Sequence, residues 1–107
     1  MPLLDLLPEH QALLLELLRR HLPGIEVWAY GSRAKGTAKP WSDLDLVAHV
    51  PPQRKPALHA LREAFEESDL PFRVDLFAWD EIPDEFRRNI EKERVVLQLP
   101  QEPMGQS

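Results

Sequence analysis

Two aspartates, Asp43 and Asp45, closely follow a glycine-rich turn that begins at Gly31 and carries Ser32. Side chains alternate along a strand, so carboxylates two residues apart leave the same face. A third carboxylate, Asp75, takes the equivalent face of a later apolar segment. Three converging carboxylates repel one another strongly unless a cation neutralises them. The pattern therefore predicts a catalytic and metal-binding trio, Asp43, Asp45 and Asp75.

Oxygen-only ligands favour Mg²⁺ or Mn²⁺ over Zn²⁺. Mg²⁺ binds one or two carboxylates and completes its shell with water and substrate phosphates. Two such ions, about 4 Å apart, can stabilise the attacking and leaving oxygens of a phosphoryl transfer. The trio thus predicts a divalent-cation cofactor, with ATP or another nucleoside triphosphate as substrate.

The turn before the trio predicts a phosphate-binding cradle. The glycines let the backbone approach an anion closely, and backbone N–H groups at the start of a short helix would face it. The Ser32 hydroxyl can donate to a phosphate oxygen, while Arg33 and Lys35 offer countercharge. The predicted nucleotide-binding residues are Gly31, Ser32, Arg33, Lys35, Gly36 and Ser42.

Each of these signals is common by itself. A lone Gly-Ser turn is usually only a turn, and a lone Asp-x-Asp is usually solvated or capping. Asp75 alone would read as an edge-strand charge that discourages aggregation. Asp69 and Asp80 are weaker candidates for the third acid, because neither lies in the middle of a strand. The joint pattern is what favours a functional site.

Apolar periodicity predicts the elements that position these residues. The predicted helices cover 9–21, 56–68 and 84–94, and the predicted strands cover 25–30, 43–50 and 72–78, with a further short strand at 95–97. In strand 43–50, alternation turns Leu44 and Leu46 toward the core and leaves the two acids on the other face. Phe86 and Ile90 are the expected anchors of the last helix. We expect one domain over 1–107, with a core at 9–98 and a frayed tail at 100–107.

The bulk composition narrows the classes of protein. The chain has 107 residues, no cysteine and a net charge of −5. The acidic balance argues against nucleic acid as a direct ligand, which needs a basic footprint. Nothing resembles a signal peptide or a membrane span, since charged and proline residues interrupt the leucine-rich start. A cytoplasmic protein without a membrane partner is expected.

These residues resemble the nucleotidyltransferase superfamily related to DNA polymerase beta. The pattern is Gly-Ser, a second glycine, Asp-x-Asp, and a later acid on a strand. It is found here as Gly31-Ser32, Gly36, Asp43-Leu44-Asp45 and Val74-Asp75-Leu76. The compact length is most similar to the minimal nucleotidyltransferases of the MntA type, encoded beside a HEPN-domain partner. The resemblance covers roughly residues 25 to 97.

The resemblance implies a fold and a reaction. The fold would be an α/β (α+β) single domain, with a mixed sheet of three to four strands and helices mainly on one face. Gly31 and Ser32 would bind the triphosphate, and Asp43 and Asp45 would ligate metal. Asp75 would ligate one metal and help deprotonate the attacking hydroxyl. Similar proteins add AMP to a tyrosine of a HEPN ribonuclease, as the antitoxin of a toxin–antitoxin pair.

Two alternative functions stay open. The nucleotide could pass to a small molecule such as an aminoglycoside, or to an RNA end. The chain could also be an antitoxin that neutralises its partner by binding alone, although the intact acids argue against this.

For several other side chains the sequence allows either a structural or a binding role. Trp41 is a loop anchor, a partner contact or a stacking surface, while Trp28 and Tyr30 are candidate walls of the nucleotide site. The leucines of the first segment that either complete the core or contact a partner are Leu3, Leu4, Leu6, Leu7 and Leu15. His10, His21, His49 and His59 have no metal-ligand spacing, and His49 is interpreted as structural.

Overall fold

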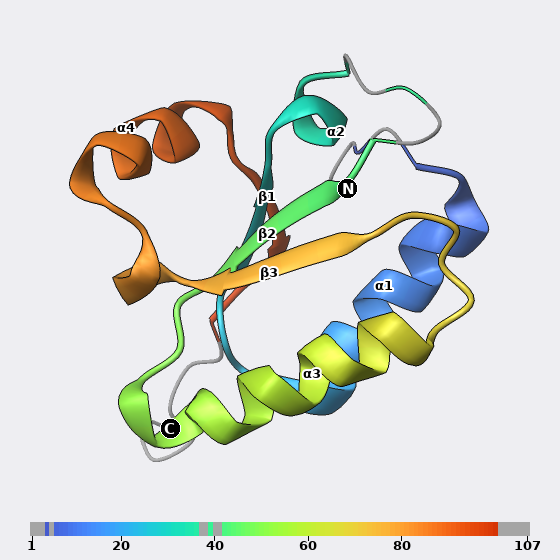
Figure 1. Cartoon of the computed structure of the whole chain (residues 1–107), viewed down its shortest axis with the longest axis horizontal. Helices are drawn as coiled ribbons and strands as arrows, with labels where there is room; N and C mark the ends of the chain where they lie inside the picture. Colours follow the sequence, from blue (N-terminus) through green and yellow to red (C-terminus); the bar gives the residue numbers. More distant parts are fainter. Residues whose placement is uncertain (1–3, 5, 37–38, 40–41, 101–107) are drawn as a thin grey trace, which may run out of the picture.

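The computed structural model describes residues 4, 6–36, 39 and 42–100, which form four α-helices, two 3-10 turns and one four-stranded sheet (Figure 1). In chain order the elements are α1 (Pro8–His21), β1 (Val27–Tyr30), α2 (Ser32–Lys35), β2 (Leu44–Ala48), η1 (Pro52–Arg54), α3 (Lys55–Glu67), β3 (Val74–Ala78), η2 (Trp79–Glu81), α4 (Asp84–Glu93) and β4 (Val95–Gln98). The predicted helices and strands are confirmed, and most of their ends agree within one or two residues. Trp41, Leu3 and the predicted tail beyond Pro100 lie outside the described residues.

The sheet has the order β3-β2-β1-β4. β1 pairs antiparallel with β2 and with β4, whereas β2 and β3 are parallel. A parallel pair requires a crossover connection, which α3 provides by crossing one face of the sheet. The predicted mixed sheet is confirmed, and β3 and β4 form its two edges.

The main core lies between the sheet and the pair α1 and α3, which cover the same face (Figure 1). Both helices turn an apolar stripe toward the sheet, as their periodicity predicts. The fully buried side chains of this core are Leu14, Leu18, Leu22, Val27, Ala29, Leu44, Leu46, Ala48, Leu58, Leu61 and Ala78. Each buried leucine contributes about 2 kcal/mol through removal of apolar surface from water, so this layer fixes the strands that carry the acids.

The opposite face of the sheet, termed the acid face, carries a second apolar cluster at one end. Trp28, Val47, Ile82 and Ile90 form it, and Trp79 packs against it. Trp79 thus packs against the cluster to which Ile90 of the last helix belongs. Trp28 is buried in this cluster and is therefore not free to line a nucleotide site; Tyr30, two residues on, is only partly buried.

The predicted anchors of the last helix are right for Ile90 and wrong for Phe86. Ile90 is buried, whereas Phe86 is 55% exposed. Ile82, which precedes the helix, packs beside Val47 and Trp28. It fills the place in the cluster that Phe86 was predicted to take. Phe86 is consequently left at the surface, next to the acid face.

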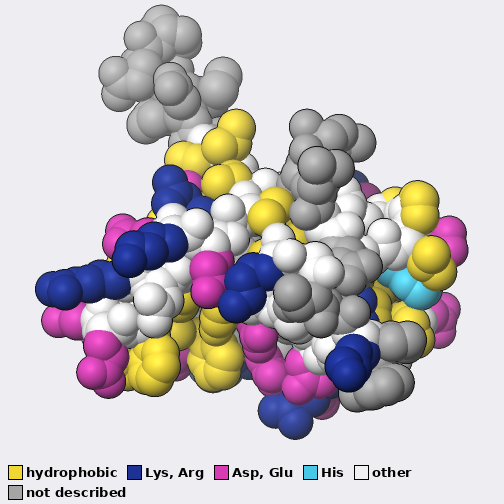
Figure 2. Space-filling view, turned by 90° about the horizontal axis from the view of Figure 1, so that it is seen from above, with side chains coloured by type: hydrophobic (Ala, Val, Ile, Leu, Met, Phe, Trp, Pro, Cys, Tyr) yellow, Lys and Arg dark blue, Asp and Glu magenta, His cyan; other side chains and the backbone are white. Residues whose placement is uncertain are grey.

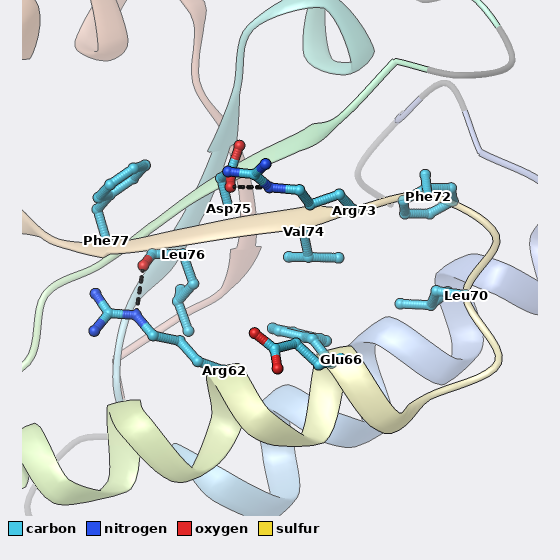
Figure 3. A pocket seen from close by; sticks show the side chains of 10 residues that line it. Arg62, Glu66, Leu70, Phe72, Arg73, Val74, Asp75, Leu76 and Phe77 are labelled. Carbon is cyan, nitrogen blue, oxygen red and sulfur yellow. Dashed lines mark hydrogen bonds and ion pairs between the residues drawn. The ribbon is translucent and has the colours of Figure 1, made fainter.

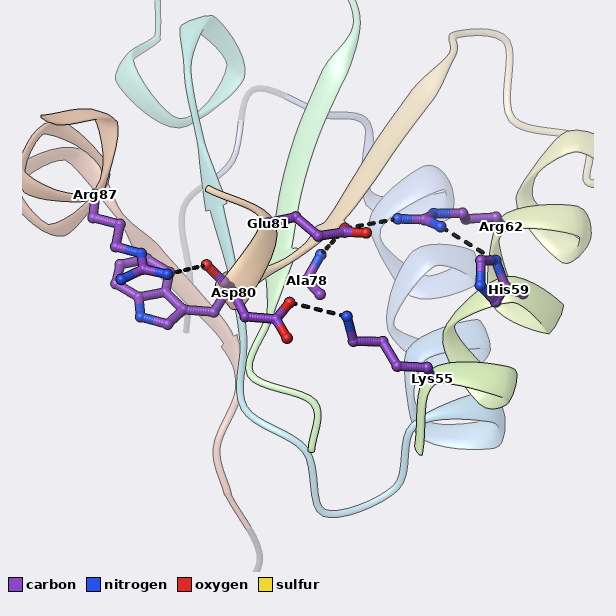
Figure 4. Close-up of polar contacts among 8 residues, drawn as sticks. Lys55, His59, Arg62, Ala78, Asp80, Glu81 and Arg87 are labelled. Carbon is purple, nitrogen blue, oxygen red and sulfur yellow. Dashed lines mark hydrogen bonds and ion pairs between the residues drawn. The ribbon is translucent and has the colours of Figure 1, made fainter. Parts of the chain in front are cut away.

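The 3-10 turn η2 is tied to α3 by ion pairs (Figure 4). Lys55 Nζ lies 2.9 Å from Asp80 Oδ1, and Arg62 Nη2 lies 3.1 Å from Glu81 Oε1. Glu81 Oε1 also accepts a hydrogen bond from the Ala78 backbone N–H at 2.8 Å. These contacts fix the end of β3 against α3, on the far side of the sheet from α4.

The leucine-rich start is shared between core and surface. Leu4, Leu6 and Leu15 pack against the main core, whereas Leu7 is 56% exposed. Most of these leucines therefore complete this domain. Within the described part of the chain, no helix is long and apolar enough to cross a membrane.

Candidate active site

Asp45 lies in the middle of the acid face with a partner on each side. In the register of the sheet it is opposite Tyr30 of β1 and opposite Asp75 of β3. Paired residues of neighbouring strands point to the same face, and the strands are about 4.8 Å apart. The three side chains therefore form one row across the sheet, termed the acid row.

Asp43 extends this row along β2. It lies two residues before Asp45, on the same face, and is exposed just ahead of the strand. The structure thus brings the three predicted acids to one face, with Asp45 and Asp75 directly paired. Asp75 is turned away from the main core, as the sequence pattern requires.

The acid row concentrates negative charge. Burial, followed by the charges of Asp75 and Asp43, raises the pKa of Asp45 to about 6. Burial, and then the charges of Asp45 and Asp75, raises the pKa of Tyr30 to about 12. Both shifts have the sign expected of acidic groups held in a negative potential. A cation placed at the row would relieve this repulsion.

One cation is already present beside the row. Arg73 Nε donates to Asp75 Oδ1 at 2.9 Å (Figure 3). The hydrogen bond and the charge of Asp75 raise the pKa of Arg73, which therefore stays cationic. The signal for Arg73 in the sequence is its position two residues before the third acid, which puts both side chains on one face of an extended segment.

The acids do not form a ready-made metal cage. Among the residues that the structure describes, no three His, Cys, Asp or Glu side chains are gathered as a metal-binding group. The donor chemistry nevertheless fits a hard divalent cation, because the acids offer oxygen ligands alone. Burial first, and then the neighbouring carboxylates, raise the pKa of Asp45, and a bound cation would oppose the second of these effects.

Gly31 joins the glycine-rich turn to the acid row. Its φ is +81°, and a Cβ added there would lie 2.6 Å from Asp45 Oδ2. No side chain fits at that distance, so the turn can approach the carboxylate only because this residue is glycine. The Gly31 carbonyl accepts hydrogen bonds from the Ala34 and Lys35 N–H groups, each at 3.1 Å, and α2 begins at Ser32.

Arg33 and Ser42 hold the segment that leads into β2. Arg33 is buried, donates from Nε to the Ser42 carbonyl at 2.9 Å, and places its guanidinium 4.3 Å from the centre of the Phe72 ring. Ser42 Oγ accepts from the Lys39 backbone N–H at 2.9 Å. These contacts give both residues a structural role beside the site.

Lys35 and Gly36 end the short helix. Lys35 Nζ lies 3.4 Å from Glu93 Oε1, which connects α2 to α4 across the surface. Gly36 has a φ of +77° in the left-handed region, and a Cβ added there would meet no atom within 4 Å. Gly36 is thus required for the turn, whereas Gly31 is required for both the turn and the contact with Asp45.

His49 is structural, in agreement with its interpretation from sequence. Its ring lies 4.3 Å from the ring of Trp28 and 4.8 Å from that of Trp79, between centroids. Burial lowers its pKa, which favours the neutral imidazole. It belongs to the apolar end of the acid face.

A model of the nucleotidyltransferase domain family matches residues 12–97. The chain is 46% identical over 96 residues to a probable protein adenylyltransferase MntA from Haemophilus influenzae, covering 89% of this chain and 84% of that protein.

Two solved structures have a similar fold. One is a toxin–antitoxin with AMP-PNP (TM-score 0.58, 20% identity, 89% of this chain and 76% of that one). The other is a tri-AMPylated Shewanella oneidensis HEPN toxin in complex with MNT antitoxin (TM-score 0.54, 15% identity, 87% and 72%). These two likenesses concern the fold alone.

Replacing Gly31 by alanine should destabilise the chain more than replacing Gly36. Gly36 has left-handed φ and ψ, which cost an alanine about 1 kcal/mol, whereas Gly31 combines a φ of +81° with a ψ of −159°, a region that is essentially restricted to glycine. Only Gly31 has a carboxylate oxygen 2.6 Å from the new methyl group. Urea denaturation should show the larger loss for Gly31→Ala, and equal losses would contradict the contact with Asp45.

Asp45→Asn should stabilise the metal-free chain at neutral pH. Because folding raises the pKa of Asp45 from 3.8 to about 6, the folded chain holds this proton more tightly than the unfolded chain. That favourable contribution is present below about pH 4 and is lost as the pH rises through about 6. Asparagine does not titrate. The free energy of unfolding of Asp45→Asn should therefore rise relative to that of the unchanged chain across this pH window, by on the order of 1 kcal/mol after solvent screening.

The measurement is urea denaturation at about pH 4.5 and about pH 7.5, with Asp69→Asn as the exposed control. Mg²⁺ at the higher pH should stabilise the unchanged chain more than the Asp45→Asn variant. If the difference in unfolding free energy between the unchanged chain and Asp45→Asn does not vary with pH, the raised pKa of Asp45 is ruled out.

Proposed function

The chain belongs to the nucleotidyltransferase domain family, in its minimal MntA-type branch, and from this premise we propose that it transfers AMP from ATP to a hydroxyl of a HEPN-type helical partner. Modification of the partner would make the chain the antitoxin of a toxin–antitoxin pair. The relative from Haemophilus influenzae is a probable protein adenylyltransferase. The solved complexes with a similar fold pair an antitoxin with a toxin, and in one of them the toxin carries AMP.

The observation that carries the proposal is the contact between the turn and the acid row. Gly31 lies against Asp45, and Asp45 is paired with Asp75. A triphosphate held over Gly31 and Ser32 would therefore have its α-phosphate at the acids. The rest of the triphosphate would extend over α2, away from β3.

Asp43, Asp45 and Asp75 would hold Mg²⁺, with Mn²⁺ as the alternative of the same chemistry. When bound, the ion would neutralise phosphate charge and the repulsion within the acid row. The triphosphate would supply further oxygen ligands to the ion. Arg73, which donates to Asp75, would then share this carboxylate with the ion.

The reaction follows from this placement. The acceptor oxygen attacks the α-phosphorus of ATP, a new O–P bond forms, and the bond from the α-phosphorus to the bridging oxygen breaks. Pyrophosphate leaves on the side of Gly31 and Ser32. The acceptor proton passes to the Asp75 carboxylate and then to solvent. Positioning and charge neutralisation supply most of the acceleration.

An apolar pocket beside the acid row suits the nucleoside. It has a volume of about 440 Å³ and lies between Tyr30, Phe77 and α4. Phe77 and Phe86 in its lining are 39% and 55% exposed, which is unusual for phenylalanine. A purine ring can stack on such aromatic faces, and the Asn89 amide in the lining can contact its polar edge.

The distribution of charge agrees with a protein acceptor. Basic and acidic side chains are interspersed over the face shown in Figure 2, and the net charge is −5. A nucleic-acid acceptor would require a continuous basic track. No such track crosses the face shown in Figure 2, which agrees with a protein acceptor recognised by shape and local contacts.

Asp43→Asn, Asp45→Asn and Asp75→Asn should each reduce transfer by about a thousandfold or more, because each removes charge at the reacting phosphate. The assay incubates the chain with α-labelled ATP and the co-encoded helical partner, and measures label on the partner. Asp69→Asn and Asp80→Asn are matched controls; Asp80 is paired with Lys55 outside the acid row. Label on neither protein in a stable complex would favour neutralisation by binding alone, and label on a small molecule or RNA would change the acceptor.

Phe86→Ala should raise the KM for ATP about fivefold or more, because an aromatic stacking surface is lost. It should leave kcat and thermal stability nearly unchanged, since Phe86 is mostly exposed. Leu7→Ala is the matched control, with 56% exposure and a position outside the pocket. An unchanged KM for ATP would place the nucleoside elsewhere.

A further inference from the structure

A groove along the outer edge of β3 shares Asp75 with the acid row (Figure 3). Its volume is about 640 Å³. Side chains of α3, including Arg62 and Glu66, line one side, Leu70 and Phe72 line the end, and β3 forms the other side. We term it the β3 groove. It gives direct access to a reacting carboxylate from the open side of the sheet.

β3 offers unpaired backbone groups to this groove. Among the described strands it pairs with β2 alone, at the edge of the sheet. The Arg73 carbonyl accepts from the Leu44 N–H at 2.9 Å, so residues 73, 75 and 77 direct their backbone groups to β2. By alternation, Val74 and Leu76 direct theirs outward. An edge of this kind is a template for another strand.

Side chains of this domain already close one end of that edge. Arg62 Nε donates to the Leu76 carbonyl at 2.9 Å, and the Ala78 N–H donates to Glu81. Val74 lies beyond these contacts, at the end of the strand nearest to Arg73. The open stretch is therefore short and centred beside Asp75.

We propose that an extended segment of the partner adds to the open edge at Val74 and so presents its acceptor hydroxyl to Asp75. The inference rests on the proposed function and assigns the surface that the acceptor uses. Main-chain hydrogen bonds to Val74 and the Leu76 N–H would give affinity, as in other cases of strand addition.

Strand geometry sets the direction of the acceptor side chain. A strand added to β3 lies about 4.8 Å away, and its side chains alternate between the two faces. The residue beside Asp75 therefore points to the acid face, where the α-phosphate is placed. Its two neighbours point to the α3 side of the groove, toward Leu70 and Phe65. The segment thus has a hydroxyl residue flanked by apolar residues.

Charge on the acid face adds one further requirement for the sequence of the partner's segment. Arg73 lies two residues before Asp75, and its side chain is 74% exposed. A carboxylate two positions from the acceptor hydroxyl would lie on the same face, next to Arg73. Pairing with this carboxylate would draw Arg73 away from Asp75. Asp75 would then be available to contact the metal ion and the acceptor hydroxyl.

Val74→Pro is the test, because it removes the outward N–H without removing a hydrogen bond of the β2–β3 ladder. Val74→Ala is its control, which shortens the side chain and keeps the N–H. We expect Val74→Pro to raise the KM for the partner about tenfold or more while the KM for ATP is unchanged. Val74→Ala should stay within about twofold of the unchanged chain.

Glu66→Trp is a second test that does not touch the strand. Glu66 is exposed on α3 and lines the groove, whereas Glu67 is exposed and does not. An indole at 66 would fill the groove, so Glu66→Trp should impair transfer to the partner and Glu67→Trp should not. Amide exchange at Val74, measured on the complex, should slow relative to the free chain.

Wild-type transfer by both Val74→Pro and Glu66→Trp would overturn the proposal and leave the proposed function intact. A homodimer of the chain that Val74→Pro dissociates would also overturn it, in favour of a second copy at this edge. Failure of the unchanged chain to label the partner would instead refute the proposed function, and this inference with it.

Discussion

The parallel pairing of β2 with β3 places Asp45 beside Asp75, and the site depends on this pairing. Like charges directly opposite each other on neighbouring strands destabilise a sheet. The pKa of Asp45, raised to about 6, reflects burial first and then that repulsion. The strands stay paired because Leu44, Leu46 and Leu76 anchor them to the main core on the other face. Hydrophobic burial thus holds two carboxylates where their own interaction would separate them.

The acid face is divided along its strands. Asp45 lies near the start of β2, just after Asp43, and Val47 lies toward its other end under Ile82 and Ile90. The apolar end allows α4 to dock, and docking of α4 builds a wall beside the polar end. The exposed Phe86 follows from this arrangement, since Ile82 already occupies the buried position. One strand therefore carries the acids and also positions the helix that borders them.

Alternation and periodicity were sufficient to predict the elements and the faces of the strands. The third acid could be identified because Asp75 lies between Val74 and Leu76, two residues that face the core. Side-chain partners could not be predicted in the same way. Arg33 turns to loop carbonyls and an aromatic ring, and Phe86 is displaced by Ile82, because both outcomes depend on packing between segments far apart in the chain. Tertiary contacts, which no local pattern encodes, decide such positions.

The location of the third acid on an edge strand has a physical reason. The Gly31 turn and α2 adjoin the acid row from the side of β1, and α4 with its apolar cluster closes the end at Val47. The direction that stays open to a large acceptor is across β3, where no further strand pairs with the sheet among the described residues. An interior strand at this place would flank Asp75 on both sides and close the approach that we propose for the acceptor. An edge strand keeps its backbone exposed, which invites unwanted pairing, and Arg62 and Glu81 limit that exposure to the stretch beside Asp75.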